Sequence, residues 1–459
     1  MVETTLLYTG KKHIHFIGAG GVNMSALALV MRDKGYSVSG SDANKTPLTE
    51  KLEAAGVKMT YAHNPENVRG ADLVVYTAAI AKDNPERVEA EKLNIPMAER
   101  STFLGELMKS YQNVCCIAGT HGKTTTSSMA GIVMQDAHLD PTVMVGGNVK
   151  ELGGNLRIGQ SDCFVAEACE YVESFLEFHP TTAIILNVDE DHLDYFTGID
   201  HIISAFHKFC MLVPENGCVI VNGTDQNALK AVENIKAPVK TFGYAETDTV
   251  YAKNISFNSE NCASYTLVKD GKEMGEISLS VPGKHNILNS LSVALYALEN
   301  GVSFESLAKS LNRFGGTGRR FERKGEYNGA LLIDDYAHHP TEISATMESA
   351  NNFDGRKIVA IFQSHTYTRT HALLKEFSEC FDLADEIIVT DIYAAREKDT
   401  GLVKPTDLTD LLEKRGKNAK YIKTFPEIAD YLKSIASDDK LFITIGAGDV
   451  FKVLDLMKD

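Results

Sequence analysis

Short apolar runs alternate with helix-like amphipathic stretches along most of the chain. In the first part, an apolar run at His13–Ile17 leads into a glycine-rich turn at Gly18–Gly21 and a helical pattern at Met24–Lys34. Further strand patterns follow at Tyr36–Ser39 and Leu73–Thr77. Strand and helix patterns that alternate in this order predict right-handed β-α-β units and a parallel sheet.

The pattern restarts after Ser110–Gln112 with a strand at Val114–Ala118 and a helix at Ser127–Met134. Further strands of this second part are expected at Phe164–Glu167, Ala183–Val188 and Cys218–Val221. The more polar stretch Thr247–Ser280 alternates with a period of two, which predicts short antiparallel strands, and a helix is expected at Asn286–Leu298.

A third part repeats the alternation of strands and helices. Its strands are expected at Leu331–Asp334, Ile358–Phe362, Glu386–Thr390 and Leu441–Ile445. It ends with a turn at Gly446–Gly448 and a helix that reaches Met457.

The length of 459 residues indicates several domains, because single cores stop growing near about 250–300 residues. We expect three consecutive α/β domains at residues 1–109, 110–321 and 322–459. The N-terminal and C-terminal domains are predicted to be Rossmann-like. The central domain is predicted to be a P-loop ATPase domain with a parallel sheet and a small antiparallel sheet.

Composition and charge narrow the class of protein. The content of 44% hydrophobic and 24% charged residues is that of a globular protein. The net charge of −16 argues against nucleic acid as a partner, and we expect no membrane segment because no apolar run approaches about 18 residues. The start Met1–Lys12 lacks a signal-peptide pattern, and the eight cysteines lack zinc spacing, so we expect a reducing, cytoplasmic location.

The strongest chemical signal follows the strand Val114–Ala118. There the chain reads Gly119, Thr120, His121, Gly122, Lys123, Thr124, Thr125. A glycine-rich turn between a strand and a helix directs backbone N–H groups toward a phosphate. Lys123 is expected to reach the β- and γ-phosphates of ATP, and Thr124 to bind Mg²⁺. The turn is shorter than the general P-loop, which has a glycine where this chain has Ile117.

Acidic residues follow the next two predicted strands of the central domain. Glu167 and Glu170 lie at the end of one strand, and the segment Asp189–His192 follows the other. Ligands bind at the carboxyl ends of parallel strands, so both clusters are expected beside the phosphate loop. Taken alone, such a cluster is more often a solvated loop.

The first domain carries a second candidate phosphate site in the turn Gly18, Ala19, Gly20, Gly21. Asp42, which follows the next strand, favours a dinucleotide-binding interpretation in which its carboxylate would bind a ribose hydroxyl. However, the third glycine of that fingerprint is replaced by Asn23. The turn is still expected to hold a diphosphate, because it places N–H groups at a helix start.

Three polar segments at predicted strand ends mark the third domain. Asp334–Pro340 is open to three interpretations: a metal site, a substrate loop or a packed turn. Gln363–Arg369 and Gly315–Arg320 supply cations. Each segment alone would usually be an exposed part of the surface. Together they indicate a cationic surface that binds an anion.

With these segments in view, the chain resembles the Mur ligase family along all three parts. The short loop Gly119–Thr126 is typical of Mur and folylpolyglutamate ligases. Further family blocks are Glu167–Glu170, Asn187–His192, His285–Asn289, Gly316–Phe321, Asp334–Pro340 and Phe362–Thr370. The Gly18 turn with Gly40–Asp42, Thr366–Arg369 and Gly446–Asp449 resemble the branch that adds L-alanine to UDP-N-acetylmuramate.

The resemblance implies an ATP- and Mg²⁺-dependent ligase. The muramoyl carboxylate would attack the γ-phosphate, and the amine of L-alanine would then attack the acyl phosphate. The implied catalytic residues are Lys123, His192, His338 and Arg369. The implied metal ligands are Thr124, Glu167 and His192. Asn286, Asn289, Arg320 and Asp335 would contact the nucleotide, and Gly18–Gly21 with Ser41 and Asp42 would hold the UDP-sugar.

Several other functions are compatible with part of these signals. A recycling ligase that joins a whole peptide to UDP-N-acetylmuramate would share most of the motifs. A folylpolyglutamate synthase would not explain the N-terminal domain that carries the turn Gly18–Gly21. A dinucleotide-dependent oxidoreductase would use Asp42 and would have no use for the Gly119 loop. A nucleotide-gated binding protein would bind ATP without releasing phosphate. Other Mur ligases use a carbamylated lysine, a role not assigned to Lys208 here because its position is out of register.

Overall fold

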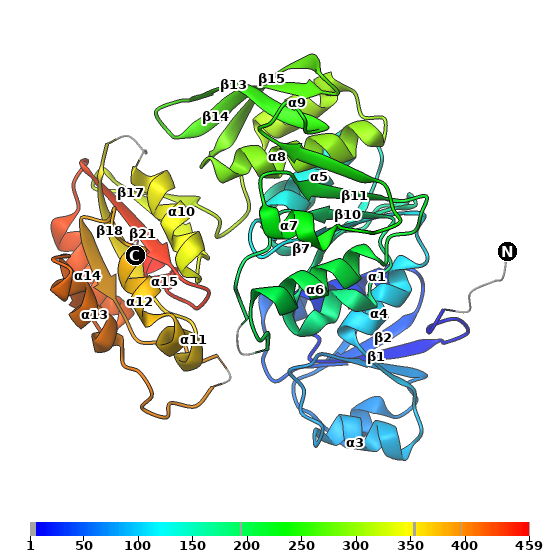
Figure 1. Cartoon of the computed structure of the whole chain (residues 1–459). Helices are drawn as coiled ribbons and strands as arrows, with labels where there is room; N and C mark the ends of the chain where they lie inside the picture. The colour runs from blue at the N-terminus through cyan, green and yellow to red at the C-terminus, as the bar shows by residue number, and fades with distance from the viewer. Residues whose placement is uncertain (1–5, 193–194, 352–354, 396, 459) are drawn as a thin grey trace. The chain divides into compact units, whose positions relative to one another are not determined.

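The computed structural model describes residues 6–192, 195–351, 355–395 and 397–458 (Figure 1). The chain forms two compact units. The first unit comprises Met1–Val188 and Asp200–Lys240, and the second comprises Asp189–Ile199 and Thr241–Asp459. Each unit is described by itself below.

The first unit opens with a parallel sheet of five strands in the order β3-β2-β1-β4-β5. Its strands are β1 (His13–Ile17), β2 (Ser37–Ser41), β3 (Lys58–Thr60), β4 (Leu73–Tyr76) and β5 (Met97–Glu99). Its helices are α1 (Val22–Asp33), α2 (Pro47–Ala54), η1 (Pro65–Val68), α3 (Pro85–Lys92) and α4 (Arg100–Met108). The sheet is parallel, as the alternation predicted, and the strand order places β1 at its centre, so the turn after β1 leaves the middle of the sheet.

The strands of the ten-stranded sheet that lie wholly in this unit have the order β11-β10-β6-β9-β7-β8. These strands are β6 (Asn113–Ala118), β7 (Thr142–Val149), β8 (Gly154–Arg157), β9 (Cys163–Ala168), β10 (Thr182–Ile185) and β11 (Cys218–Asn222). They pair in parallel except for β8, which is antiparallel to β7. Helices α5 (Lys123–Asp136), α6 (Ile199–Cys210) and α7 (Gln226–Ala231) belong to this part. The strand β6 is central, so the phosphate loop also emerges from the middle of a parallel sheet.

The second unit begins with strands that the alternating polar stretch predicted. Strand β12 (Val239–Gly243) is followed by β13 (Val250–Phe257), β14 (Cys262–Lys269) and β15 (Lys272–Pro282). Strand β14 pairs antiparallel with both β13 and β15. These three strands have eight, eight and eleven residues and are therefore longer than expected. Helices α8 (His285–Glu299) and α9 (Phe304–Arg313) follow.

The remainder of the second unit is a sheet of six strands in the order β16-β17-β21-β18-β19-β20. The strands are β16 (Glu322–Tyr327), β17 (Ala330–Asp335), β18 (Lys357–Phe362), β19 (Glu386–Val389), β20 (Ala419–Tyr421) and β21 (Lys440–Ile445). Only β16 is antiparallel to its neighbour. The helices are α10 (Pro340–Asn351), α11 (Tyr367–Ala372), α12 (Leu374–Glu379), α13 (Pro405–Lys414), α14 (Phe425–Ile435) and α15 (Lys452–Lys458).

Both faces of this sheet are buried, which explains its continuous apolar runs. Ile358, Ala360 and Phe362 of β18 pack in one cluster with residues of α10, α12 and α13. Val359 and Ile361, which alternate with them, pack in another cluster with residues of α14 and α15 (Figure 1). Successive side chains of a strand point to opposite faces, so a strand covered on both faces must be apolar at every position.

The helices that cover these sheets are short. The longest described helix, α8, has 15 residues. In the part of the chain described, no helix combines the length and the apolar character that crossing a membrane requires.

Truncating one core aromatic should destabilise the second unit. Phe362 is fully buried, and its ring centroid lies 5.3 Å from that of Phe377 and 5.2 Å from that of Phe381. We expect Phe362→Ala to cost about 3–5 kcal/mol, because it removes apolar contacts and leaves a cavity. Urea unfolding followed by circular dichroism measures the loss, since the chain has no tryptophan. Phe257, which is 44% exposed, is the matched control, and equal losses in both variants would contradict the packing argument.

Candidate active site

The phosphate loop leaves β6 through a backbone that requires glycine at two positions. Gly119 has φ of 151° and Gly122 has φ of 85°, and both values lie in a region that other residues rarely adopt. A Cβ on Gly119 would lie 2.9 Å from the Cβ of Leu186. Gly122 is the N-cap of α5, so the first-turn N–H groups of this helix have no partner within the helix and can bind an anion.

A single residue after β10 holds the loop in place. The side-chain oxygen of Asn187 accepts a hydrogen bond from the N–H of His121 at 2.7 Å, and its amide nitrogen donates to the carbonyl of His121 at 3.0 Å. The backbone carbonyl of Asn187 also accepts from the N–H of Thr120 at 3.2 Å. Sequence reasoning assigned no role to Asn187. Its signals were a polar amide at the end of an apolar strand and its place as the first residue of the family block Asn187–His192.

The side chain of Lys123, at the start of α5, is 16% exposed and forms an ion pair. Its Nζ lies 2.9 Å from one carboxylate oxygen of Glu170 and donates to the carbonyl of Thr120 at 3.1 Å. Burial lowers the pKa of Lys123, but the Glu170 carboxylate outweighs burial and raises it to about 12. The ammonium is therefore charged at neutral pH, and Glu170 compensates that charge when no phosphate is present.

Thr124 and Glu167 form an oxygen-rich pair beside Lys123. The hydroxyl of Thr124 donates to one Glu167 oxygen at 3.2 Å. The other oxygen accepts from the hydroxyl of Ser127 at 3.1 Å and from the N–H of Gly146 at 2.5 Å. Hydroxyl and carboxylate oxygens are the hard donors that Mg²⁺ prefers. Among the described residues, no three His, Cys, Asp or Glu side chains form a metal-binding group, so a Mg²⁺ here would take its other ligands from phosphate and water.

The N-terminal turn uses several of its own N–H groups. Gly18 and Ala19 donate to the carbonyl of Ser41 at 2.8 and 2.9 Å. Gly20 donates to the carboxylate of Asp42 at 2.9 Å. Asp42 therefore holds the turn to the end of β2. The first turn of α1 provides the remaining N–H groups that can receive a diphosphate.

In the second unit, the two predicted adenine ligands lie together at the start of α8. The amide nitrogen of Asn289 donates to the side-chain oxygen of Asn286 at 2.9 Å. Asn286 in turn donates to the carbonyl of Pro282 at 2.7 Å. Both residues are buried, and the amide oxygen of Asn289 is by its chemistry a hydrogen-bond acceptor.

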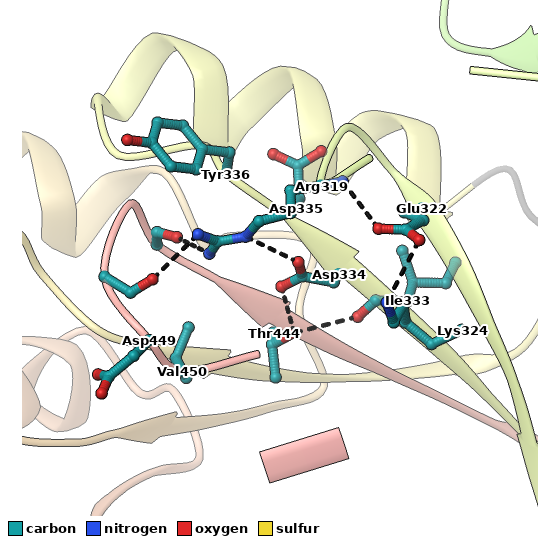
Figure 2. A network of polar contacts seen from close by, with 12 residues as sticks. Arg319, Glu322, Lys324, Ile333, Asp334, Asp335, Tyr336, Thr444, Asp449 and Val450 are labelled. Carbon is teal, nitrogen blue, oxygen red and sulfur yellow. Dashed lines mark hydrogen bonds and ion pairs between the residues drawn. The ribbon is translucent and has the colours of Figure 1, made fainter. Parts of the chain in front are cut away.

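The two adjacent arginines before β16 have different roles. The guanidinium of Arg319 bonds to the buried carboxylate of Asp334 at 3.0 Å and to the carbonyls of Gly446 and Gly448 at 2.6 and 3.0 Å (Figure 2). Asp334 also accepts from the hydroxyl of Thr444 at 2.7 Å. Arg319 therefore fixes the segment to β17 and to the turn after β21.

Arg320, the arginine predicted to contact the nucleotide, lies over the ring of Tyr336, with 5.2 Å from its guanidinium carbon to the ring centroid. The neighbouring Asp335 is buried, and its two oxygens accept from the N–H groups of Phe321 and Ala337, each at 2.7 Å. Burial raises the pKa of Asp335 to about 6, although Arg320 and these hydrogen bonds oppose it. Asp335 thus connects the Arg320 segment to the loop that carries His338.

His338 is held as a neutral imidazole. Its Nδ1 lies 3.1 Å from the carbonyl of Tyr336 and 3.3 Å from a carboxylate oxygen of Glu342. Burial lowers the pKa of His338 to about 4, although Glu342 opposes this shift. A nitrogen beside a carbonyl must be the donor, so Nδ1 carries the proton and Nε2 is the acceptor.

Arg369 and His192 are connected through Asp191 in the second unit. A guanidinium nitrogen of Arg369 lies 3.2 Å from a carboxylate oxygen of Asp191, and the N–H of His192 donates to the same oxygen at 2.6 Å. His192 has φ of 53°, a left-handed conformation that is uncommon for histidine. Lys208 on α6 pairs with Glu173 at 2.9 Å. This pairing supplies no reason to assign Lys208 a catalytic role.

The first unit thus brings the phosphate loop together with Glu167, and the second unit gathers Arg320, Asp335 and His338 on adjacent loops. Three sheets, a short glycine loop and paired oxygen donors indicate a nucleotide-binding protein of several α/β domains.

Sequence comparisons agree with this class. The chain matches "Mur ligase family, catalytic domain" over residues 13–112, "Mur ligase middle domain" over 117–297 and "Mur ligase, glutamate ligase domain" over 319–448. It is 49% identical over 442 residues to UDP-N-acetylmuramate–L-alanine ligase of Caldanaerobacter subterraneus subsp. tengcongensis, covering 96% of each chain.

Solved structures show the same fold. The UDP-N-acetylmuramate-alanine ligase MurC of Thermotoga maritima matches with a TM-score of 0.83 and 30% identity over 98% of each chain. A murein peptide ligase of Psychrobacter arcticus matches with a TM-score of 0.72 and 24% identity over 97% of this chain and 98% of that one. The chain belongs to the Mur ligase family. The expected three-domain α/β architecture is confirmed.

Removing the side chain of Asn187 should weaken ATP binding without unfolding the unit. Asn187→Ala removes both side-chain hydrogen bonds to His121, each worth about 0.5–1.5 kcal/mol, so we expect the Kd for ATP to rise about tenfold. Isothermal titration calorimetry measures this change. Asn227→Ala is the matched control, because its amide bonds to Val188 after the same strand but does not contact the loop. An unchanged ATP affinity in Asn187→Ala would contradict the proposed support.

The low pKa of His338 should make the stability of the second unit depend on pH. The folded state keeps His338 neutral down to pH of about 4, whereas the unfolded chain takes up a proton near the ordinary value of 6.5. The unfolded state therefore binds more protons in this window, and stability is complete above pH of about 6.5 and falls by about 3 kcal/mol as the pH drops to about 4. Urea unfolding of wild type and His338→Gln across this range tests the sign. Parallel pH dependences for the two proteins would refute it.

Proposed function

We propose that this chain is an ATP-dependent ligase that joins L-alanine to UDP-N-acetylmuramate in peptidoglycan precursor synthesis, and that it acts in the cytoplasm. The observation that carries the proposal is the loop Gly119–Thr125, which presents a helix start, a charged Lys123 and the Thr124–Glu167 oxygen pair at one point. The similarity to alanine-adding ligases over 96% of the chain supports the choice of substrates.

The reaction requires activation of a carboxylate, which is a poor electrophile. A muramoyl carboxylate oxygen bonds to the γ-phosphorus of ATP, the bond from this phosphorus to the β,γ-bridging oxygen breaks, and ADP leaves. The amine of L-alanine then attacks the acyl carbon, inorganic phosphate leaves with the bonding electrons, and the amine loses a proton. Catalysis of such a sequence rests on positioning and on neutralising phosphate charge.

The residues of the first unit would bind the triphosphate. The N–H groups at the start of α5 would hold the phosphate oxygens, and Lys123 would exchange its contact with Glu170 for the β- and γ-phosphates. Thr124 and Glu167 would hold Mg²⁺, which when bound supplies charge neutralisation for the phosphates. Glu170 would remain near enough to balance the Lys123 charge when the nucleotide leaves.

In the second unit, the residues implied by the family resemblance would contact the nucleotide and the acyl group. Asn286 and Asn289 would bind adenine, and Arg320 would contact the phosphates, with Asp335 holding its segment in place. His192 would contribute to a metal site. Arg369 would face the acyl phosphate. His338, neutral and with Nε2 as an acceptor, would face the reacting carboxyl group without adding charge. The turn Gly18–Gly21, with Ser41 and Asp42 behind it, would receive the UDP diphosphate.

Phosphate release with ATP, Mg²⁺ and UDP-N-acetylmuramate, measured across a panel of amino acids and with a tripeptide, tests the proposal. We expect turnover with L-alanine and at least tenfold less with other acceptors, a discrimination of about 1.4 kcal/mol or more. Preference for the tripeptide would identify a recycling ligase instead.

Lys123→Ala should reduce this turnover by at least about a hundredfold while the fold survives, because it removes a charge aimed at the transferred phosphate. Lys208→Ala is the control of the same residue type, on an exposed ion pair. Circular dichroism of each variant checks the fold. Full activity in Lys123→Ala would overturn the assignment of the loop.

A further inference from the structure

Helix α11, labelled in Figure 1, carries Arg369 and begins at a strained residue. Its N-cap Thr366 has φ of 64° and ψ of 146°, and a β-branched residue rarely adopts a positive φ. Such a conformation persists only where the surrounding structure fixes it. The side chain of Thr366 makes no capping hydrogen bond to the first turn of the helix. The first N–H groups of α11 therefore need acceptors from another part of the chain.

Glu397, which lies 30 residues beyond Tyr367, supplies these acceptors. Its Oε2 accepts from the N–H of Tyr367 at 2.7 Å and from the N–H of Thr368 at 3.0 Å, and its Oε1 accepts from the hydroxyl of Thr368. Burial opposes ionisation, but these hydrogen bonds outweigh burial and lower the pKa of Glu397. A carboxylate at the start of a helix is also favoured by the helix dipole.

The segment that carries Glu397 holds the strained residue at a second point. The N–H of Thr366 donates to the carbonyl of Tyr393 at 2.9 Å, and the N–H of Tyr393 donates to the carbonyl of Ser364 at 2.9 Å. The rings of His365 and Tyr393 stack, with 5.7 Å between their centroids. The segment after β19 therefore contacts the segment after β18 on both sides of Thr366.

These contacts matter because α11 has only six residues. Isolated helices shorter than about 12 residues are marginal in water, so the direction of Arg369 depends on what holds the ends of the helix. The side chain of Arg369 is 15% exposed and contacts Asp191 at 3.2 Å. Burial is the main cause of the low pKa of His338, and the charge of Arg369 lowers it further, although Glu342 opposes both. Arg369 is therefore close enough to His338 to act on the same site.

We propose that Glu397 is a positioning residue for Arg369. By accepting the first N–H groups of α11, its carboxylate fixes the helix and directs the guanidinium toward the reacting group. In this role Glu397 acts only through α11 and touches no substrate. The inference rests on the proposed function, in which Arg369 faces the acyl phosphate.

Two substitutions of Glu397 separate positioning from direct participation in the chemistry. We expect Glu397→Ala to lower kcat about tenfold while the KM values for ATP and UDP-N-acetylmuramate stay within about twofold, because a displaced guanidinium weakens a contact made in the transition state. Glu397→Gln should keep at least about a third of the wild-type kcat, since one amide oxygen can replace Oε2 and accept both N–H groups. Phosphate release measures both variants. A Gln variant as impaired as the Ala variant would show that the charge itself is needed and would overturn the positioning role.

Glu427 is the matched control, because it caps a helix that carries no candidate site residue. Its carboxylate accepts from the N–H of Thr424 at 3.2 Å and from its hydroxyl at 2.7 Å, at the start of α14. Hydrogen–deuterium exchange of peptides spanning the two helix starts reports each cap without requiring ligase chemistry. We expect Glu397→Ala and Glu427→Ala each to lose protection at its own helix, and only Glu397→Ala to lose turnover. Lost protection at α11 with wild-type turnover would reduce Glu397 to a structural cap and overturn the proposal.

A double-mutant cycle tests whether Glu397 acts through Arg369. If it does, adding Glu397→Ala to Arg369→Ala should change turnover by less than about twofold, because the side chain that Glu397 positions is already gone. Circular dichroism of each variant checks the fold. Effects of the two substitutions that multiply would refute an action through Arg369.

Failure of this inference differs from failure of the proposed function. Each variant is compared with wild type using the acceptor that the wild type turns over, so a preference for the tripeptide would refute the proposed acceptor and leave the Glu397 comparison intact. Wild-type protein that releases no phosphate with any acceptor would refute the proposed function. The exchange comparison would then still decide whether Glu397 holds the start of α11.

Discussion

The arrangement of the phosphate loop depends on the hydrogen bonds between Asn187 and residues Thr120 and His121. These bonds tie the end of β10 to the turn that leaves β6, and Gly119 allows the backbone to approach β10 closely. The turn then directs α5 so that its unpaired N–H groups, Lys123 and Thr124 emerge at one place. Without this tie the glycines would make the turn flexible, because they do not restrict their own backbone.

Buried carboxylates with cationic or hydrogen-bonding partners recur beside the candidate functional segments. Lys123 pairs with Glu170, Arg319 pairs with Asp334, and Glu86 is surrounded by donors. A buried ion pair adds little net stability, because desolvation offsets the attraction, but breaking one leaves an uncompensated charge and is costly. Such pairs therefore favour one geometry over its alternatives. Here they position the phosphate loop, the Arg320 segment and the N-terminal turn.

The family assignment and the geometry support each other at different levels. Similarity over nearly the whole chain identifies a Mur ligase, and the candidate site shows how local contacts set the charge of individual groups. The neutral state of His338 follows from burial beside a carbonyl, and the charged state of Lys123 follows from Glu170. The two groups thus differ in charge, one cationic and one neutral, for local reasons within their own units.

Local patterns in the amino-acid sequence were sufficient for the strands, the helices and the glycine turns. The expected strand Ile358–Phe362 is β18, and the expected helix Met24–Lys34 is α1, because apolar periodicity reflects burial on one or both faces. The clustering of chemistry at strand ends followed from the parallel topology. Residue roles that depend on partners distant in the chain required the folded structure: Asn187 on the loop, Arg319 rather than Arg320 in the turn contacts, and Glu86 beneath Ser41. Strand register and side-chain direction decide such contacts, and neither is written in the spacing of residues along the chain.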